Sequence, residues 1–131
     1  MTSCGVWLSR RGLVAVVADD NASMIELPFT ASRTDDARWA LLTHVEAHHG
    51  LNCALVLCAS LARSDPLAML AAKRGGRVWI VRDEFVDNLC LVAGLRRVPP
   101  KRLALMLARL PLCTELQKWL EPIRMQLPLF R

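Results

Sequence analysis

The sequence predicts an α/β domain built on a mixed sheet of five strands. Three features support this prediction. The first thirty residues alternate short apolar runs with turn residues, and the middle of the chain alternates apolar runs with capped helical segments. No apolar run approaches the ~20 residues that span a bilayer. Strands joined by tight turns are antiparallel and strands separated by helices are parallel, so we expect an antiparallel meander followed by parallel strands with flanking helices.

The meander is expected to contain strands at residues 5–9, 13–18 and 24–29. Arg10-Arg11-Gly12 and Asp19-Asp20-Asn21 have the composition of the connecting turns. Pro28 has no N–H to donate to a neighbouring strand, so its position predicts that the third strand lies at an edge of the sheet.

The alternating part begins with a helix from Thr34 or Asp35 to a stop at Gly50. The unbroken apolar run Cys53–Ala59 is typical of a central parallel strand, whose two faces are both covered. A further strand is expected at 77–81, and further helices are expected after Ser64-Asp65-Pro66, from Asp83 to Gly94, at 101–110 and at 113–120. We expect one domain at 1–121 and a separate tail at 122–131, beginning at Pro122.

Composition and charge indicate the kind of partner and the cellular compartment to expect. The 131 residues carry 17 Lys and Arg against 12 Asp and Glu, for a net charge of +5 that suits contacts with phosphate or carboxylate groups. Five scattered cysteines are typical of free thiols in a reducing compartment. The N-terminus does not resemble a secretory signal, so we expect a cytoplasmic protein with no membrane partner.

The order of predicted elements over residues 4–95 resembles the ribonuclease-H-like fold, shared by ribonuclease H, Holliday-junction resolvases and many transposases. This resemblance implies two metal ions held by carboxylates on the first strand, at the end of the first strand after the meander and on a later helix. The two strand positions hold Val6–Ser9 and Cys58–Ser60, without a carboxylate. Only Asp83, Glu84 and Asp87 could stand for the helical acids. We therefore expect no catalytic residue, no metal and no cofactor.

The C-terminal stretch Gln126-Leu127-Pro128-Leu129-Phe130 resembles the short peptide by which many bacterial replication and repair proteins bind the sliding clamp. The resemblance implies that the Gln126 amide enters a polar subpocket and that Leu129 and Phe130 fill a deep apolar pocket. Leu127 would take the first apolar position of the motif. Pro128 departs from the usual Ser or Asp, but it favours an extended Leu127, which lowers the entropy lost on docking.

Two other groups of residues are candidate binding sites. Arg96, Arg97, Lys101 and Arg102 place four cations around Pro99-Pro100, where they could contact a DNA backbone. His44 and His48 lie four residues apart on a predicted helix, beside His49, and so share a face. Because no third metal ligand is evident nearby, we interpret these histidines as favourable charges at a helix C-terminus.

These observations predict a non-catalytic adaptor or regulator of bacterial DNA replication or repair, including the SOS response, that binds the polymerase sliding clamp through residues 126–130. DNA or another DNA-repair protein is a further expected partner. One alternative is a metal-dependent nuclease with displaced acids, namely Asp19, Asp20, Asp83 and Asp87. Another is a structural subunit of a larger DNA-processing assembly, with the apolar helices after Pro99 as its interface. The tail could also pack on its own domain through Ile123, Leu127 and Phe130.

Overall fold

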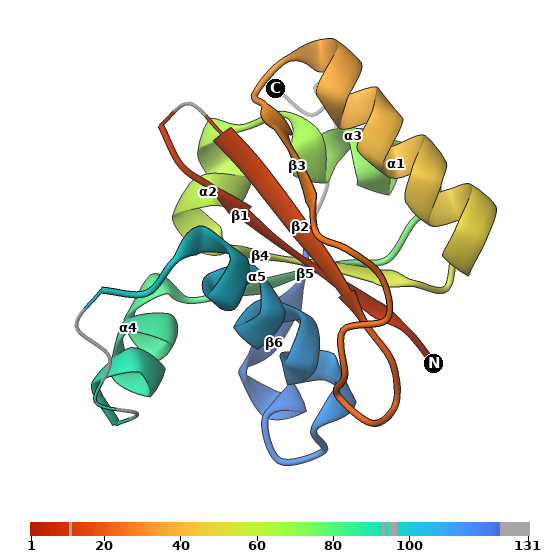
Figure 1. Cartoon of the computed structure of the whole chain (residues 1–131). Coiled ribbons are helices and arrows are strands. Elements are labelled where there is room, and N and C mark those ends of the chain that lie inside the picture. Colours follow the sequence, from red (N-terminus) through yellow and green to blue (C-terminus); the bar gives the residue numbers. More distant parts are fainter. Residues whose placement is uncertain (11, 93, 95–96, 124–131) are drawn as a thin grey trace, which may run out of the picture.

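The computed structural model describes residues 1–10, 12–92, 94 and 97–123 of the chain, and its elements follow one another as shown in Figure 1. The strands are β1 (Ser3–Leu8), β2 (Gly12–Ala18), β3 (Phe29–Ser32), β4 (Ala54–Cys58), β5 (Val78–Val81) and β6 (Leu120–Pro122). The helices are α1 (Asp35–His49), α2 (Ala59–Ser64), α3 (Leu67–Lys73), α4 (Asp83–Val92) and α5 (Pro100–Arg109), with short 3-10 turns η1 (Leu110–Leu112) and η2 (Gln117–Trp119).

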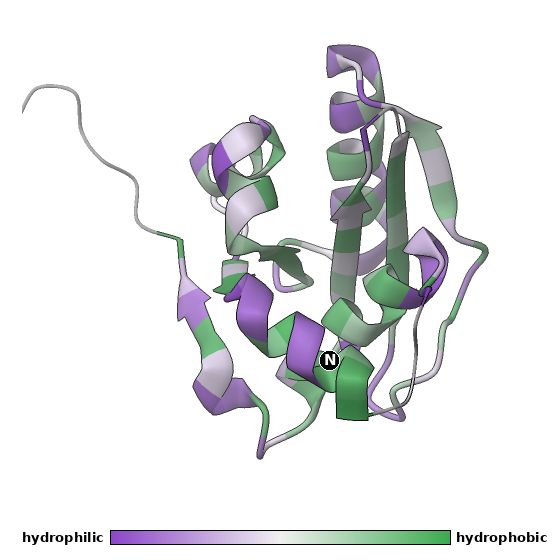
Figure 2. Ribbon diagram, turned by 90° about the vertical axis from the view of Figure 1, so that its left-hand side faces the viewer, coloured by the Kyte–Doolittle hydropathy of each residue, from purple (hydrophilic) through white to green (hydrophobic). Residues whose placement is uncertain are grey.

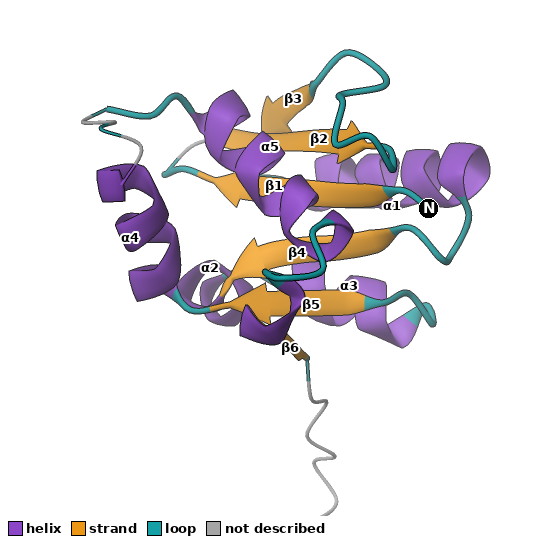
Figure 3. Cartoon of the chain, turned by 90° about the horizontal axis from the view of Figure 1, so that it is seen from below, coloured by secondary structure: helices purple, strands orange, loops and turns teal. Residues whose placement is uncertain are grey.

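The strands form one mixed sheet in the order β3-β2-β1-β4-β5-β6. The strands β1, β2 and β3 pair antiparallel, as a meander requires. The strands β1, β4 and β5 are parallel neighbours, because α1 and the α2–α3 segment carry the chain back between them. Antiparallel β6 then closes the far edge against β5. The carboxyl ends of β1, β4 and β5 therefore meet at one end of the sheet (Figure 3).

Helices cover both faces of this sheet. The helix α5 crosses one face, and α1 and α3 lie on the other (Figure 3). The larger core cluster joins the alternate strand residues Cys4, Val6 and Leu8 to Leu41 of α1 and Leu67 of α3. The second cluster joins Val56, Cys58 and Val81 to Val86 of α4 and to Leu103, Leu107 and Leu110. The central strands are accordingly hydrophobic along their length, whereas the helices alternate hydrophobic and hydrophilic bands (Figure 2).

The contact between α5 and β1 is unusually close. A Cβ atom built on Gly5 would lie 1.9 Å from the Ala104 carbonyl oxygen and 2.5 Å from the Ala108 nitrogen. Only glycine on the strand and small residues on the helix permit this approach of two backbones. The buried face of α5 consists of Leu103, Ala104, Leu107 and Ala108. That face of α5 packs within the chain, so an assembly interface after Pro99 would have to use other residues.

The structure confirms the mixed α/β fold class and corrects three elements. The third strand is Phe29–Ser32, not 24–29, since β2 pairs with the residues that follow Pro28 and only Met24 makes an isolated bridge to Ala18. The strand expected at Cys53–Ala59 is shorter, Ala54–Cys58. The segment Ala59–Ser64, for which no element was expected, forms the helix α2.

The third correction concerns the C-terminal part of the described chain. The helix expected at 113–120 is replaced by 3-10 turns and the sixth strand, β6. A three-residue strand has no periodicity of its own and is stabilised by its pairing with β5, in which Val81 faces Leu120 and Trp79 faces Pro122. Pro122, where the tail was expected to begin, is therefore the last residue of β6.

A buried ion pair connects three segments on the α1 side of the sheet. The Asp65 side chain is fully buried between α2 and α3. Its carboxylate accepts hydrogen bonds from Arg33 Nε at 3.1 Å, from Arg38 Nε at 2.9 Å and Nη2 at 3.0 Å, and from the Leu67 N–H at 2.9 Å. The sequence indicated the last of these contacts, since Asp65 was expected to cap a helix, but it did not indicate the two arginines.

No helix in the described part of the chain has both the length and the apolar character required to cross a membrane.

Candidate functional site

The carboxyl ends of β4 and β5 border a hollow on the described surface. Ligands of open α/β sheets bind beyond the carboxyl ends of the strands, because helices and loops diverge there. Here α2 begins at Ala59, directly after β4, and α4 begins at Asp83, one residue after β5. The Ser60 N–H donates to Asp83 Oδ1 at 3.2 Å and so connects the two helix starts.

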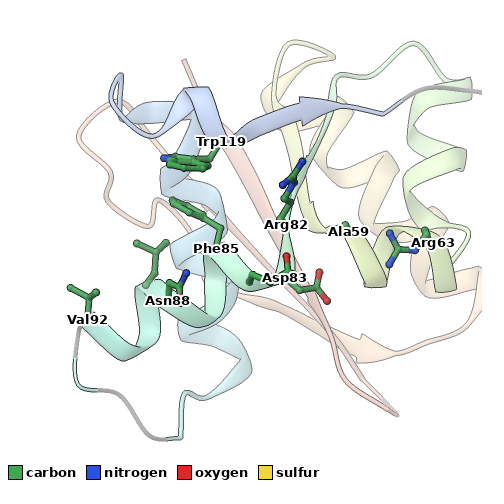
Figure 4. Close-up of a pocket in the computed structure, with 10 residues that line it drawn as sticks. Ala59, Arg63, Arg82, Asp83, Phe85, Asn88, Val92 and Trp119 are labelled. Carbon is green, nitrogen blue, oxygen red and sulfur yellow. The ribbon is translucent and has the colours of Figure 1, made fainter.

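This hollow, hereafter the cleft, has a volume of about 880 Å³. Its lining combines charged and aromatic groups (Figure 4). The residues are Ala59, Arg63, Arg82, Asp83, Glu84, Phe85, Asn88, Leu89, Val92 and Trp119. The rings of Phe85 and Trp119 stack with centroids 5.0 Å apart and an angle of 22° between their planes. Together with the exposed guanidinium groups of Arg63 and Arg82, they suit an anionic or aromatic ligand.

Among the described residues, α4 brings two carboxylates close to the end of β4. Asp83 and Asp87 lie four residues apart on α4 and so share a helix face. Their charges act on Cys58, the last residue of β4. Burial, followed by the nearby carboxylates of Asp83 and Asp87 and the Cys90 thiol, raises the pKa of Cys58 to about 12. The strand position next to the acids therefore holds a neutral, buried thiol.

The first strand places a tryptophan on the same face of the sheet. Gly5 pairs with Val56, so Trp7 and Cys58, each two residues further along, continue on one face toward the carboxyl ends. Trp7 is half-buried and packs with Cys58 in the second core cluster. An indole and a thiol thus lie within the two stretches, Val6–Ser9 and Cys58–Ser60, for which the fold resemblance implies acids.

The donor set does not fit a pair of divalent metal ions. Two such ions, bridged between an attacking and a leaving oxygen, require carboxylates on both sides. In the described structure β1 and the end of β4 supply none, and Asp83 and Asp87 approach from one helix only.

The acids of the displaced-nuclease alternative do not meet at one site. Asp20 lies beside the chain start, where its Oδ2 is 3.0 Å from the Met1 ammonium nitrogen. Asp19 accepts hydrogen bonds from the Asn21 and Ser23 N–H groups within a turn. Both follow β2, which ends opposite Ser3, at the amino end of β1. Asp83 and Asp87 lie at the carboxyl ends, about one strand length away, so a site combining all four acids is ruled out in this structure.

The cations predicted to contact DNA lie partly within the described structure. Arg97, Lys101 and Arg102 are exposed around the start of α5 and form no ion pair within the described structure. Arg96 and the tail residues Gln126, Leu127, Pro128, Leu129 and Phe130 lie outside the described residues.

Arg63, Arg82, Phe85 and Trp119 of the cleft were not predicted as site residues. The place of Arg82 could have been predicted from the sequence, since it directly follows a predicted parallel strand. Trp119 had none, because its place beside Phe85 depends on the unexpected turn before β6.

No protein-family model matches the chain, and neither does any curated protein. Five chains of solved structures match it. One of them is T. thermophilus RuvC in complex with a Holliday junction substrate, with a TM-score of 0.60 and 12% sequence identity over 94% of this chain and 99% of that one. At this identity the likeness concerns the fold alone, and it confirms that the chain has the ribonuclease-H-like fold that its order of elements suggested.

Proposed function

We propose that this chain is a non-catalytic adaptor or regulator in bacterial DNA replication or repair, and that it binds the DNA polymerase sliding clamp through residues 126–130. The observation that carries the proposal is the sequence Gln126-Leu127-Pro128-Leu129-Phe130. It combines an amide side chain with an aliphatic-aromatic pair, the kind of anchor that dominates the affinity of peptide recognition.

The position of Ile123, three residues before the motif, supports this role. Ile123 donates its N–H to the Val78 carbonyl at 3.0 Å and packs on the larger core cluster. The motif therefore begins three residues beyond a fixed point at the outer edge of the sheet. A span of three residues reaches at most about 10 Å, so a bound clamp would lie close to the β5–β6 edge.

The proposal of a non-catalytic domain is supported by the chemistry at the strand ends. Trp7 and Cys58 offer neither the charge nor the oxygen ligands that hard divalent cations require. The structural neighbour RuvC was solved with a Holliday junction, so the fold itself is compatible with DNA processing. DNA contact through Arg97, Lys101 and Arg102 is a secondary part of the proposal.

Binding of the purified chain to a purified bacterial sliding clamp, measured by calorimetry or surface plasmon resonance, tests the proposal. Replacing both Leu129 and Phe130 by Ala removes two apolar anchors. Anchors of this kind are worth about 2 kcal/mol or more each, and losing one alone lowers affinity ~30-fold. Losing both should therefore lower affinity by between ~30-fold and ~1000-fold. Met125→Ala, just outside the motif, is the matched control and should bind as the native chain does. Native protein that does not bind the clamp, or a double variant that binds equally well, would overturn the proposal.

A nuclease remains the second candidate, because Asp83 and Asp87 both lie near Cys58 at the strand ends. Cleavage of four-way junctions and RNA–DNA hybrids in Mg²⁺ or Mn²⁺ distinguishes the two functions. We expect no cleavage. Cleavage by the native chain that is lost in Asp83→Asn, but kept in the Asp20→Asn control, would establish the nuclease instead.

A further inference from the structure

Three side chains with metal-binding donor atoms converge at a place remote from the cleft. The Glu26 carboxylate oxygen Oε1 lies 2.9 Å from His44 Nε2 and 3.2 Å from His49 Nε2. All three ligand atoms lie within 4.8 Å of one another. The two imidazoles come from the last turns of α1, and the carboxylate comes from the loop between β2 and β3.

Backbone contacts hold both sides of this cluster in place. The Ile25 N–H donates to the Val17 carbonyl at 3.1 Å, which fixes Glu26 against the end of β2. His44 and His49 belong to a helix whose buried side packs on the same sheet. His49 is mostly buried, with 11% of its side chain exposed, and His44 and Glu26 are partly exposed at 34% and 30%. The site is thus preorganised and open on one side.

We propose that Glu26, His44 and His49 form a transition-metal site that takes Zn²⁺. Two imidazoles and one carboxylate are a ligand set found in zinc sites that keep one position open for water. Bonds of about 2.0–2.1 Å in a tetrahedron separate neighbouring ligand atoms by roughly 3.3 Å. The observed separations of 2.9 and 3.2 Å from the Glu26 oxygen to the two imidazole nitrogens are close to this value, and all three ligand atoms lie within 4.8 Å of one another.

The surroundings leave room for a fourth ligand. His49 borders a hollow of about 520 Å³, which is also lined by Met1, Thr2, Asn52 and Arg77. Water can reach the metal position past the partly exposed side chains of Glu26 and His44. The site would tie the β2–β3 loop to the C-terminal end of α1, so metal binding should stabilise that connection. It is independent of the cleft and of the proposed clamp contact.

The third histidine provides a matched control. His48 stacks on His44 with ring centroids 4.3 Å apart, but its Nδ1 lies 3.0 Å from the His44 carbonyl oxygen and it does not belong to the ligand group. It has the same chemistry and the same helix as the proposed ligands. It therefore separates a specific site from non-specific binding to neighbouring histidines.

Calorimetric titration of the untagged full chain with Zn²⁺, with its cysteines kept reduced, tests the site. We expect one equivalent to bind and to raise the melting temperature. Losing an outer-shell hydrogen bond to a metal ligand already costs about 10–100-fold in affinity, so removing a ligand in Glu26→Gln, His44→Ala or His49→Ala should cost at least ~100-fold. The His48 ring bonds the His44 backbone carbonyl and neither ligand imidazole. His48→Ala should bind as the native chain does. Circular dichroism confirms that each variant is folded.

Substitution with Co²⁺ tests the donor atoms directly. Nitrogen and oxygen ligands in a tetrahedron give visible absorption without a strong thiolate charge-transfer band in the near ultraviolet. This distinction matters because the buried thiols of Cys4 and Cys53 lie close enough for the Glu26 charge to act on them. A strong thiolate band, native binding in the His49→Ala variant, or the absence of Zn²⁺ binding by the folded native chain would each overturn the proposal.

Discussion

Replacing Asp65 by Ala should destabilise the domain more than any other loss of a single charge among the described residues. Its carboxylate is fully buried and joins the β3–α1 loop, α1 and the α2–α3 junction through Arg33, Arg38 and the Leu67 N–H. Removal leaves two guanidinium groups without the carboxylate that they share. Both arginines are largely buried, with 22% and 11% of their side chains exposed.

The size of the effect follows from those contacts. Removing one partner of a buried ion pair costs about 3–5 kcal/mol, because the remaining charge stays desolvated without compensation. The arginines retain some access to water, which favours the lower end, about 3 kcal/mol. For a domain with a free energy of unfolding of about 5–15 kcal/mol, this is a large fraction of the total.

Urea unfolding followed by tryptophan fluorescence measures this change. With a slope of about 2 kcal/mol/M, the midpoint should fall by about 1.5 M. Asp36→Ala is the control, since Asp36 is an exposed first-turn residue of α1 without an ion pair among the described residues, and it should lose only the ~0.3–1 kcal/mol of a helix-dipole contact. A loss below 1 kcal/mol in Asp65→Ala would refute the assignment of this ion pair as a major stabilising contact.

The same carboxylate predicts a dependence of stability on pH. Burial alone would raise the pKa of Asp65, but hydrogen bonds from Arg38, the Leu67 N–H and Arg33 outweigh it and hold the pKa below its ordinary value. The ionised form is therefore favoured in the folded state. Its contribution is fully present above the unfolded pKa of about 3.9 and is lost as the pH falls through the lower folded value. The Asp65→Asn variant should lack this part of the acid-induced loss of stability.

Two further predictions concern the close approach of α5 and the burial of the cysteines. Gly5→Ala should destabilise by about 2–3 kcal/mol in thermal unfolding, because the α5 backbone must move to admit a Cβ, whereas Gly12→Ala meets only the flexible Ser9 hydroxyl and should cost far less; equal losses would contradict the close approach of α5. In the native chain, a thiol reagent at pH 8 should modify the half-buried Cys90 and Cys113 first. Cys4, Cys53 and Cys58 should react only after unfolding, and early labelling of Cys58 would contradict its burial and its pKa of about 12.

The sequence predicted those features that depend on neighbours along the chain. Thr34 caps α1 by accepting from the Ala37 N–H, and Gly50 ends that helix with a φ of +81°, as their residue types indicated. The missing strand acids could also be predicted, since a position in a strand suffices to identify them.

Features that depend on distant partners could not be predicted. Asp65 meets Arg33 across 32 positions, and Glu26 meets His44 across 18, so no local spacing signals either contact. The strand β6 was missed for the same reason, because its hydrogen bonds to β5 are what define it. Clamp binding through Gln126–Phe130, which lie outside the described residues, stays a prediction.

The absence of acids from Val6–Ser9 and Cys58–Ser60 and the close packing of α5 belong to one structural arrangement. Metal ions and a substrate at the carboxyl ends would require solvated space over β1 and β4. Here Trp7 and Cys58 fill part of that space with apolar volume, and Gly5 lets α5 lie directly on β1. Carboxylates at these two positions would be buried against the second core cluster and would require desolvation without counter-charges. The packing that stabilises this face thus opposes a two-metal site, which is why the proposed function rests on recognition by the C-terminal residues and not on chemistry at the strand ends.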